Sequence, residues 1–175
     1  KGKKTEVFSF SPPTHGAHPN PNGNMITQIS GALLDAGLVA EEDKQIFHFL
    51  RTLSKDIHGH CLNIAYAHPV MGEPIVATTQ IDDVDGYIKV YLRIRYPAGI
   101  TVDEMEENIK KAVDGFGFIV EKSTPGTPAY LMNPDTKEIK MLTRIANEIT
   151  CADKPPYTLS GGTYAHRLPN AYAFG

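Results

Sequence analysis

The fold is decided by one stretch, which reads Ile75-Val76-Ala77-Thr78-Thr79-Gln80-Ile81, continues through Asp83-Val84-Asp85-Gly86, and ends with Tyr87-Ile88-Lys89-Val90-Tyr91-Leu92-Arg93-Ile94-Arg95-Tyr96. Both outer runs are rich in strand-forming residues, and Asp-Gly is a strong signal for a tight turn. In the second run Ile88, Val90, Leu92 and Ile94 face one way, while Lys89, Tyr91, Arg93 and Arg95 face the other. One face therefore packs on a core, and the other is exposed or lines a binding site. We predict an antiparallel hairpin at the centre of a sheet, with the four apolar residues buried under helices.

Strand and helix signals on both sides of this hairpin complete a recognisable order. Glu6–Phe10 alternates like a strand, and helical patterns follow at 24–37 and 41–54. After the hairpin, Thr101 and Glu104 form a capping box that begins a helix, and Phe118–Glu121 returns as a strand. The expected apolar faces are Met25, Ile29, Ala32 and Ala36 in the first helix, Ile46, Phe49, Leu50 and Leu53 in the second, and Val102, Met105, Ile109, Ala112 and Val113 in the third. The sequence thus predicts an α+β fold: a ferredoxin-like βαββαβ unit with an extra helix, at residues 1–127.

Residues 128–175 differ from this unit. Asn133 and Pro134 are a good N-cap and first-turn pair for a helix with an apolar face of Ile139, Leu142, Ile145, Ala146 and Ile149. Short strands are expected at 157–164 and 171–175. One helix and two short strands cannot cover their own apolar face, so we interpret this part as an incomplete edge of a larger α/β domain. The first residue is not Met, and we expect the chain to enter its first domain partway.

Composition limits the classes of function. The 175 residues carry a net charge of -3 and are 41% hydrophobic, which is typical of an ordinary globular protein. The acidic balance argues against nucleic-acid binding, and no apolar run is long enough to span a membrane. The two cysteines are far apart in the sequence and suit a reducing cytoplasm, where we place the protein.

Residue patterns alone do not assemble a catalytic site. His58 and His60 would lie on one face if they were in a strand, and they are the best metal-ligand pair, but two exposed loop histidines are the more ordinary interpretation. No recognised metal-ligand spacing occurs, and no Ser-His-Asp or Cys-His arrangement can be placed. Gly161-Gly162-Thr163 is a weak candidate for a phosphate loop, since it lacks the lysine and the longer glycine spacing of a P-loop.

Three motifs, taken together, are more specific. Thr14-His15-Gly16-Ala17-His18-Pro19 with Asn22-Gly23-Asn24 resembles the His-x-x-x-Pro…Gly-x-Asn segment in the lid domain of dizinc metallopeptidases of the carboxypeptidase G, aminoacylase and PepV dipeptidase superfamily. Arg95-Tyr96-Pro97-Ala98-Gly99 is similar to the Arg-Tyr-Pro-x-Gly strand end of PepV-type, carnosinase-like Xaa-His dipeptidases. Ser160-Gly161-Gly162-Thr163-Tyr164-Ala165, with Asn170 and Ala173-Phe174-Gly175, resembles that branch's Gly-Gly-Thr-Tyr-Ala-Arg…Asn…Ala-Phe-Gly segment.

The resemblance implies roles for individual residues. His15 matches the lid histidine that stabilises the oxyanion forming on the scissile carbonyl. Arg95 matches the arginine that holds the C-terminal carboxylate of the substrate. Gly161, Gly162 and Thr163 match a loop that approaches the substrate through its backbone. His166 stands where the family has an arginine and Arg167 follows it, so either residue is a candidate for that polar contact.

The resemblance also implies what this chain lacks. The family holds two zinc ions on ligands of its catalytic domain, and none of those ligands can be placed here, so we assign no metal-binding residue. We therefore expect the lid domain and part of the catalytic domain of a cytoplasmic zinc dipeptidase acting on dipeptides or short peptides, a fragment that is inactive alone. The uncovered helix after Asn133 would favour self-association. The alternative is a free-standing ferredoxin-like regulatory module that binds a small molecule.

Overall fold

The fold is organised around the hairpin, as seen in a computed structural model that describes residues 24–85, 87–122, 125–159 and 161–173. Strand β1 (Ile75–Val84) pairs antiparallel with β2 (Tyr87–Arg95), and Ile75 lies opposite Arg95. The register shifts between Thr78 and Gln80, where a bulge interrupts the ladder. The predicted hairpin is therefore confirmed, and among the described residues its two strands form the whole sheet.

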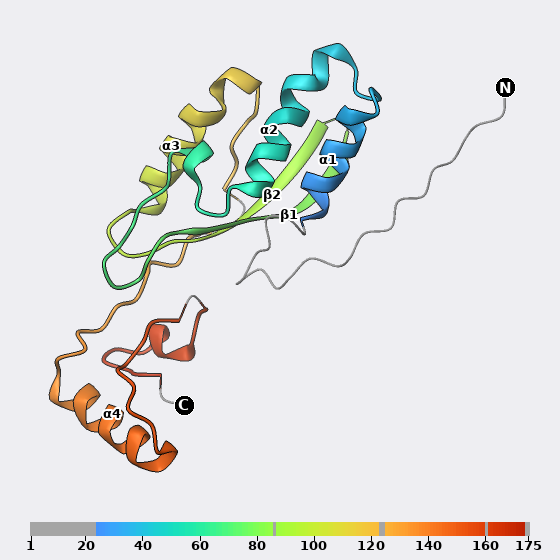
Figure 1. The fold of residues 1–175 in the computed structure, drawn as a ribbon. Coiled ribbons are helices and arrows are strands. Elements are labelled where there is room, and N and C mark those ends of the chain that lie inside the picture. The colour runs from blue at the N-terminus through green and yellow to red at the C-terminus, as the bar shows by residue number, and fades with distance from the viewer. Residues whose placement is uncertain (1–23, 86, 123–124, 160, 174–175) are drawn as a thin grey trace.

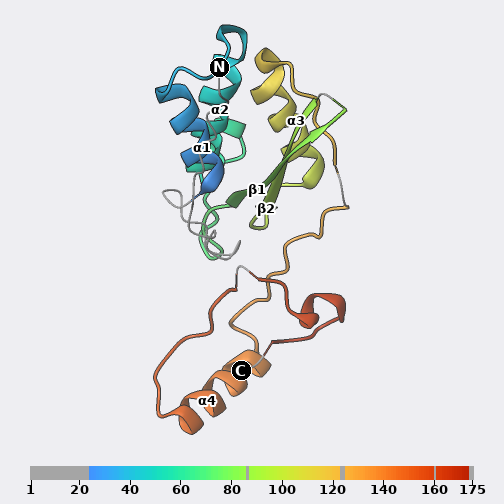
Figure 2. The same ribbon diagram turned by 90° about the vertical axis from the view of Figure 1, so that its right-hand side faces the viewer.

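Three helices cover one face of this hairpin (Figures 1 and 2): α1 (Met25–Asp35), α2 (Lys44–Lys55) and α3 (Val102–Val113). Short 3₁₀ turns lie at Glu41–Asp43, His60–Leu62 and Asp114–Phe116. The buried core between helices and sheet consists of Phe49, Leu53, Leu62, Ile64, Val76, Met105 and Val113. Its members come from α2, the segment that follows it, β1 and α3, so the core joins the sheet to the helices on one side only.

Helices α2 and α3 use the faces that the sequence predicts. Phe49, Leu50 and Leu53 are buried in α2. At the start of α3 the N–H of Glu104 donates to Thr101 Oγ1 at 3.2 Å, and the Thr101 N–H donates to Glu104 Oε2 at 2.8 Å. Both bonds of the capping box are therefore present, and they satisfy N–H groups that the helix itself cannot pair.

The prediction for α1 is wrong about which face is buried. Met25 and Ile29 are 37% and 39% exposed, whereas Thr27, Ser30 and Gly31 are buried. The reason is the close approach of α2: a Cβ built on Gly31 would already be in contact with the Arg51 side chain, 3.8 Å from its Nε. Small residues allow this approach, and here they decide the orientation of the helix more than hydrophobicity does.

The predicted register of β2 is right, but its buried face is shorter than expected. Val90, Leu92 and Ile94 pack against the core, and Lys89 and Arg93 are exposed on the other face. Ile88 is 47% exposed because the turn end of the hairpin extends past the helices that cover the rest.

The strand predicted at Phe118–Glu121 does not form. Phe118 and Val120 pack against the core, and Lys89 Nζ lies 3.3 Å from Glu121 Oε2, but the segment does not pair with a strand. Apolar contacts satisfy these side chains without a backbone ladder. The other predicted outer strand, at 6–10, lies outside the described residues. The described part is thus an α+β arrangement with a two-stranded antiparallel sheet.

The C-terminal part contains α4 (Lys137–Thr150) and a 3₁₀ turn at Tyr164–Arg167, which lie apart from the three other helices (Figure 1). The N-cap of α4 is Thr136, not Asn133 as predicted, because Thr136 Oγ1 accepts from the Ile139 N–H. Asn133 instead forms a turn, in which its Oδ1 accepts from the Asp135 N–H at 2.9 Å. The strand predicted at 157–164 is absent among its described residues, and residues 171–173 form none either.

No residue of α4 is fully buried, but the predicted apolar face is only partly uncovered: Ile149 is 76% exposed, whereas Ile139, Leu142, Ile145 and Ala146 are half-buried.

Candidate functional site

The candidate site is the end of β2 and the chain that follows it. Arg95 is the last residue of the strand, is half-buried, and lies on the face opposite the helices. Arg93 lies two positions earlier on the same face and is exposed. The cross-strand partners of Arg93 and Arg95 are Ala77 and Ile75. The backbone of both arginines therefore belongs to a hydrogen-bonded hairpin, and such a rigid element positions side chains well for recognition.

Each of the four residues after Arg95 is constrained by a hydrogen bond, by burial or by its backbone conformation. The Tyr96 hydroxyl donates to the Thr127 carbonyl at 2.7 Å, and burial raises the pKa of this phenol. Pro97 is buried, and the Ala98 N–H donates to Met71 Sδ at 3.4 Å. Gly99 has a φ of +105°. The Tyr-Pro-Ala-Gly sequence is thus a structural support that holds the direction of the chain where the strand ends.

A loop from Tyr66 to Gly72 packs against this support. His68 and Gly72 bridge each other through two backbone hydrogen bonds of 2.9 Å. The ring Nδ1 of His68 accepts from the N–H groups of Val70 and Met71, each at 3.1 Å. The ring therefore holds the loop that supplies the sulfur contact to Ala98. The sequence patterns did not identify this loop, although Gly72 was an available turn signal.

Gly99 is required by both conformation and space. A Cβ built there would lie 2.6 Å from the Tyr66 hydroxyl oxygen, and a φ of +105° is strained for any residue with a side chain. We expect Gly99→Ala to lower the free energy of unfolding by about 1–3 kcal/mol. Chemical denaturation checks this, with Gly115→Ala as the matched control, because Gly115 has no neighbour within 4 Å of the added atom. An equal loss in both variants would contradict this role of Gly99.

The two histidines weighed as metal ligands lie in a loop. Gly59 between them has a φ of +77°, so no strand places the imidazoles on one face. His58 Nδ1 is 3.0 Å from the Pro74 carbonyl oxygen and 3.5 Å from Glu73 Oε2, while His60 is exposed. Both histidines are therefore loop residues, as the ordinary interpretation expects, but only His60 is exposed and His58 is half-buried. In the described part of the chain, no three His, Cys, Asp or Glu side chains come together as a metal site would require.

Asp56 organises the same loop. Its carboxylate accepts from the N–H groups of His58, Gly59 and Cys61, at 3.3, 3.0 and 2.6 Å. Burial opposes ionisation, but these hydrogen bonds outweigh it and hold the pKa of Asp56 below its usual value. Burial, with the adjacent Asp56 carboxylate, raises the pKa of the Cys61 thiol to about 12. Cys61 is therefore protonated at neutral pH and is not a nucleophile.

The Gly-Gly-Thr segment leads into the 3₁₀ turn. Gly161 and Gly162 are exposed, Thr163 is half-buried, and Tyr164 begins the turn. The Thr163 carbonyl oxygen accepts a hydrogen bond from the Nδ1–H of His166, so in the neutral ring Nε2 is the acceptor nitrogen.

Arg167 is exposed beside the folded-back ring of His166. The structure places this segment with α4 and apart from the hairpin (Figures 1 and 2). His15 lies outside the described residues, so its position relative to Arg95 is not described.

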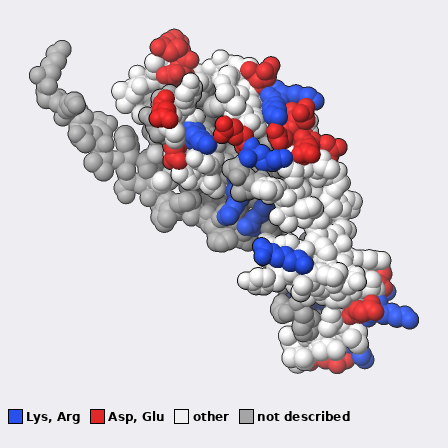
Figure 3. All heavy atoms as spheres, turned by 180° about the vertical axis from the view of Figure 1, so that it is seen from behind, with Lys and Arg blue, Asp and Glu red and all other residues white. Residues whose placement is uncertain are grey.

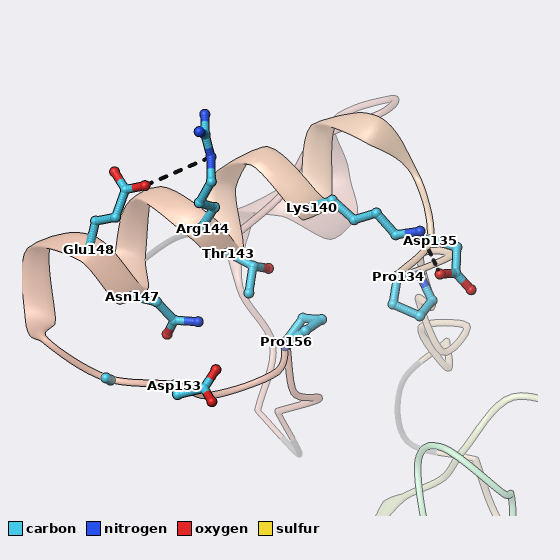
Figure 4. A pocket seen from close by; sticks show the side chains of 10 residues that line it. Pro134, Asp135, Lys140, Thr143, Arg144, Asn147, Glu148, Asp153 and Pro156 are labelled. Atoms are coloured by element: carbon cyan, nitrogen blue, oxygen red, sulfur yellow. Dashed lines mark ion pairs between the residues drawn. The ribbon is translucent and has the colours of Figure 1, made fainter.

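A shallow groove of about 640 Å³ runs beside α4 (Figure 4). Four of its five charged groups form ion pairs, with Lys140 Nζ 2.9 Å from Asp135 Oδ1 and Arg144 Nε 3.9 Å from Glu148 Oε1, and Asp153 is the fifth. The Asn147 side chain exchanges two hydrogen bonds with the backbone of Lys154, at 3.0 and 3.2 Å. The groove lies between α4 and the loop that follows it, and both acidic and basic side chains line it.

None of the helices in the described ranges has the length and apolarity that a membrane crossing needs.

The amino-acid sequence of this chain is similar to those of known proteins. No family model matches the chain. A protein of Staphylococcus saprophyticus named "Putative dipeptidase" is 29% identical over 167 residues, which cover 92% of this chain and 34% of that protein. Proteins of the same name from Staphylococcus aureus strains USA300 and NCTC 8325 are 30% identical over 84 residues, or 48% of this chain and 18% of theirs. The chain is thus related to dipeptidase-like proteins and spans about a third of the length of the first of them.

Proposed function

We propose that this chain forms the lid and substrate-binding part of a zinc-dependent, PepV-type dipeptidase. The observation that carries the proposal is the sequence similarity to dipeptidase-named proteins over 92% of the chain. A free-standing regulatory module would need only the first 127 residues. Similarity that extends over nearly all of the chain favours the dipeptidase, because the part after Gly126 is then shared as well.

Arg95 is the proposed anchor for the C-terminal carboxylate of the substrate. Its support is the rigid end of β2, where Ile75 lies opposite Arg95 and the next four residues are fixed. A guanidinium group presents parallel N–H donors that match the two oxygens of a carboxylate, so it orients the peptide as well as binding it. Orientation of this kind contributes to catalysis by placing the scissile bond.

The remaining roles rest on the motif resemblance. We propose that His15 donates a hydrogen bond to the oxyanion that forms on the scissile carbonyl, an interaction made in the transition state. We propose that Gly161, Gly162 and Thr163 contact the substrate through backbone groups. His166 supplies the neighbouring polar contact, since its Nε2 is left available by the Nδ1 contact to Thr163.

Zinc does not fit the described residues taken alone, because no three candidate ligands come together among them. We propose that the zinc ligands lie elsewhere, and we derive no step of the reaction through the metal. What the chain itself supplies is recognition of the carboxylate, orientation of the peptide and a donor for the oxyanion.

Hydrolysis of a dipeptide such as Ala-Gln tests this proposal. The full-length protein with zinc is expected to release the two amino acids, and a chelator should abolish the release. The 175-residue chain alone is expected to show no turnover and only weak zinc binding by calorimetry, since a dizinc site needs several ligands at fixed spacing. A full-length protein without activity would contradict the dipeptidase. Tight, stoichiometric zinc with turnover in the 175-residue chain would contradict the assignment of zinc ligands elsewhere.

A further inference from the structure

The outer face of the hairpin carries three cationic residues of β2, Lys89, Arg93 and Arg95, with Tyr91 at the alternate position between the first two. Residues two apart on a strand share a face, and their Cα atoms are separated by about 6–7 Å along it. Figure 3 shows some Lys and Arg side chains in the middle of one face of the molecule, while above and below them Asp and Glu side chains lie beside other Lys and Arg side chains. The charges at the two ends of this face differ in the carboxylates that lie near them.

The charge of Lys89 is compensated. Lys89 lies opposite Asp82 across the hairpin, and its Nζ is 3.3 Å from Glu121 Oε2. The same ammonium lies 5.6 Å from the centre of the Tyr91 ring. An additional anion near Lys89 would therefore have to compete with two carboxylates.

Arg93 has no such compensation in the part of the chain that the structure describes. Its cross-strand partner is Ala77, whose methyl group neither neutralises nor shields a guanidinium group. No described carboxylate forms an ion pair with Arg93, and its side chain is exposed. An exposed, uncompensated guanidinium beside Arg95 produces a local positive potential on this side of the sheet.

We propose that Arg93 is a specificity-determining residue that binds a second carboxylate of the substrate, so that the preferred substrates are dipeptides ending in aspartate or glutamate. This inference rests on the proposed role of Arg95 as anchor for the main-chain carboxylate. In a C-terminal glutamate the two carboxyl groups are separated by three carbon atoms, and in aspartate by two. Two long, neighbouring arginine side chains on one strand face can each bind one of them.

The test compares Ala-Glu with Ala-Gln, which have the same shape and differ in charge. Wild-type full-length protein is expected to show a higher kcat/KM for Ala-Glu. Arg93→Gln is expected to lower the ratio of the two kcat/KM values by about two- to fivefold, the effect of an exposed ion pair. Lys89→Gln is the matched control, since Lys89 is on the same face but already compensated, and it should leave the ratio unchanged. About 1 M salt should also reduce the wild-type preference, because it screens charges beyond about 3 Å.

Each outcome is decisive. An unchanged ratio in Arg93→Gln, or an equal fall in Lys89→Gln, would overturn the inference, the second because a diffuse field would then explain the preference. Inorganic phosphate as a competitor tests the anion site: stronger inhibition of Ala-Glu turnover than of Ala-Gln turnover, with the excess lost in Arg93→Gln, supports a site for the side-chain carboxylate. Equal inhibition of the two dipeptides in wild type would oppose it. A protein that hydrolyses neither dipeptide would contradict the proposed function itself, which keeps the two failures distinct.

Discussion

Replacing His15 by alanine in the full-length enzyme is expected to lower kcat on the order of 10²–10³-fold with little change in KM, the range observed for the loss of one oxyanion donor. The reason is that the imidazole N–H strengthens its hydrogen bond only as negative charge develops on the scissile carbonyl oxygen. Steady-state kinetics with Ala-Gln measures both constants. The loss of an interaction that is made equally in the ground state would instead raise KM and leave kcat unchanged.

The control for this variant is His18→Ala, because His18 belongs to the same short segment but does not fit the His-x-x-x-Pro spacing. We expect His18→Ala to keep most of the wild-type kcat. Equal losses in the two variants would show that the segment has a general structural role, and a change confined to KM would remove the oxyanion role of His15.

The second large effect concerns Arg95. We expect Arg95→Ala to reduce kcat/KM for dipeptides with a free C-terminal carboxylate by about 10- to 100-fold, since hydrogen bonds to charged groups are worth about 1.5–3 kcal/mol. Substrates with an amidated C-terminus lack the anionic partner and should lose much less. The measurement is the ratio of kcat/KM for each free and amidated pair, in wild type and variant.

Arg95→Lys separates charge from geometry. Lysine keeps the positive charge but has no planar pair of donors, so it should recover only part of the lost kcat/KM. Equal losses for free and amidated substrates in Arg95→Ala would remove the anchor role. Full recovery by lysine would mean that charge alone matters and that bidentate recognition does not contribute.

The part of the fold that the sequence predicted well is the part where a local pattern and its tertiary environment agree. Val90, Leu92 and Ile94 alternate with polar residues in a run that follows the Asp-Gly turn signal of the sequence, and the structure places these apolar side chains against the core. The capping box of α3 is equally local, since its two partners are three residues apart.

The predictions from sequence are wrong where contacts between residues distant in the sequence determine the local structure. In α1, packing of Gly31 against Arg51 buries small residues and leaves Met25 and Ile29 outside. At Phe118–Glu121, burial of two side chains is achieved without strand pairing.

For the candidate site, the motif identified Arg95 but not its support. The contacts of Tyr66 with Gly99 and of Met71 with Ala98 join segments about 30 residues apart, and no periodic pattern marks them. His68 organises its loop through backbone N–H groups, which composition cannot show. The sequence thus indicates the residue that we propose as the anchor, while the structure adds how the strand end that carries it is held.

The central claim is that Arg95 anchors the carboxylate of a peptide substrate. Its most direct test is a crystal structure of the full-length protein with a phosphinate analogue of a dipeptide, which resembles the tetrahedral transition state. We predict that the C-terminal carboxylate of the analogue forms two hydrogen bonds with the Arg95 guanidinium group while a phosphinate oxygen faces His15. A carboxylate bound at another site, with Arg95 directed away from the ligand, would contradict it.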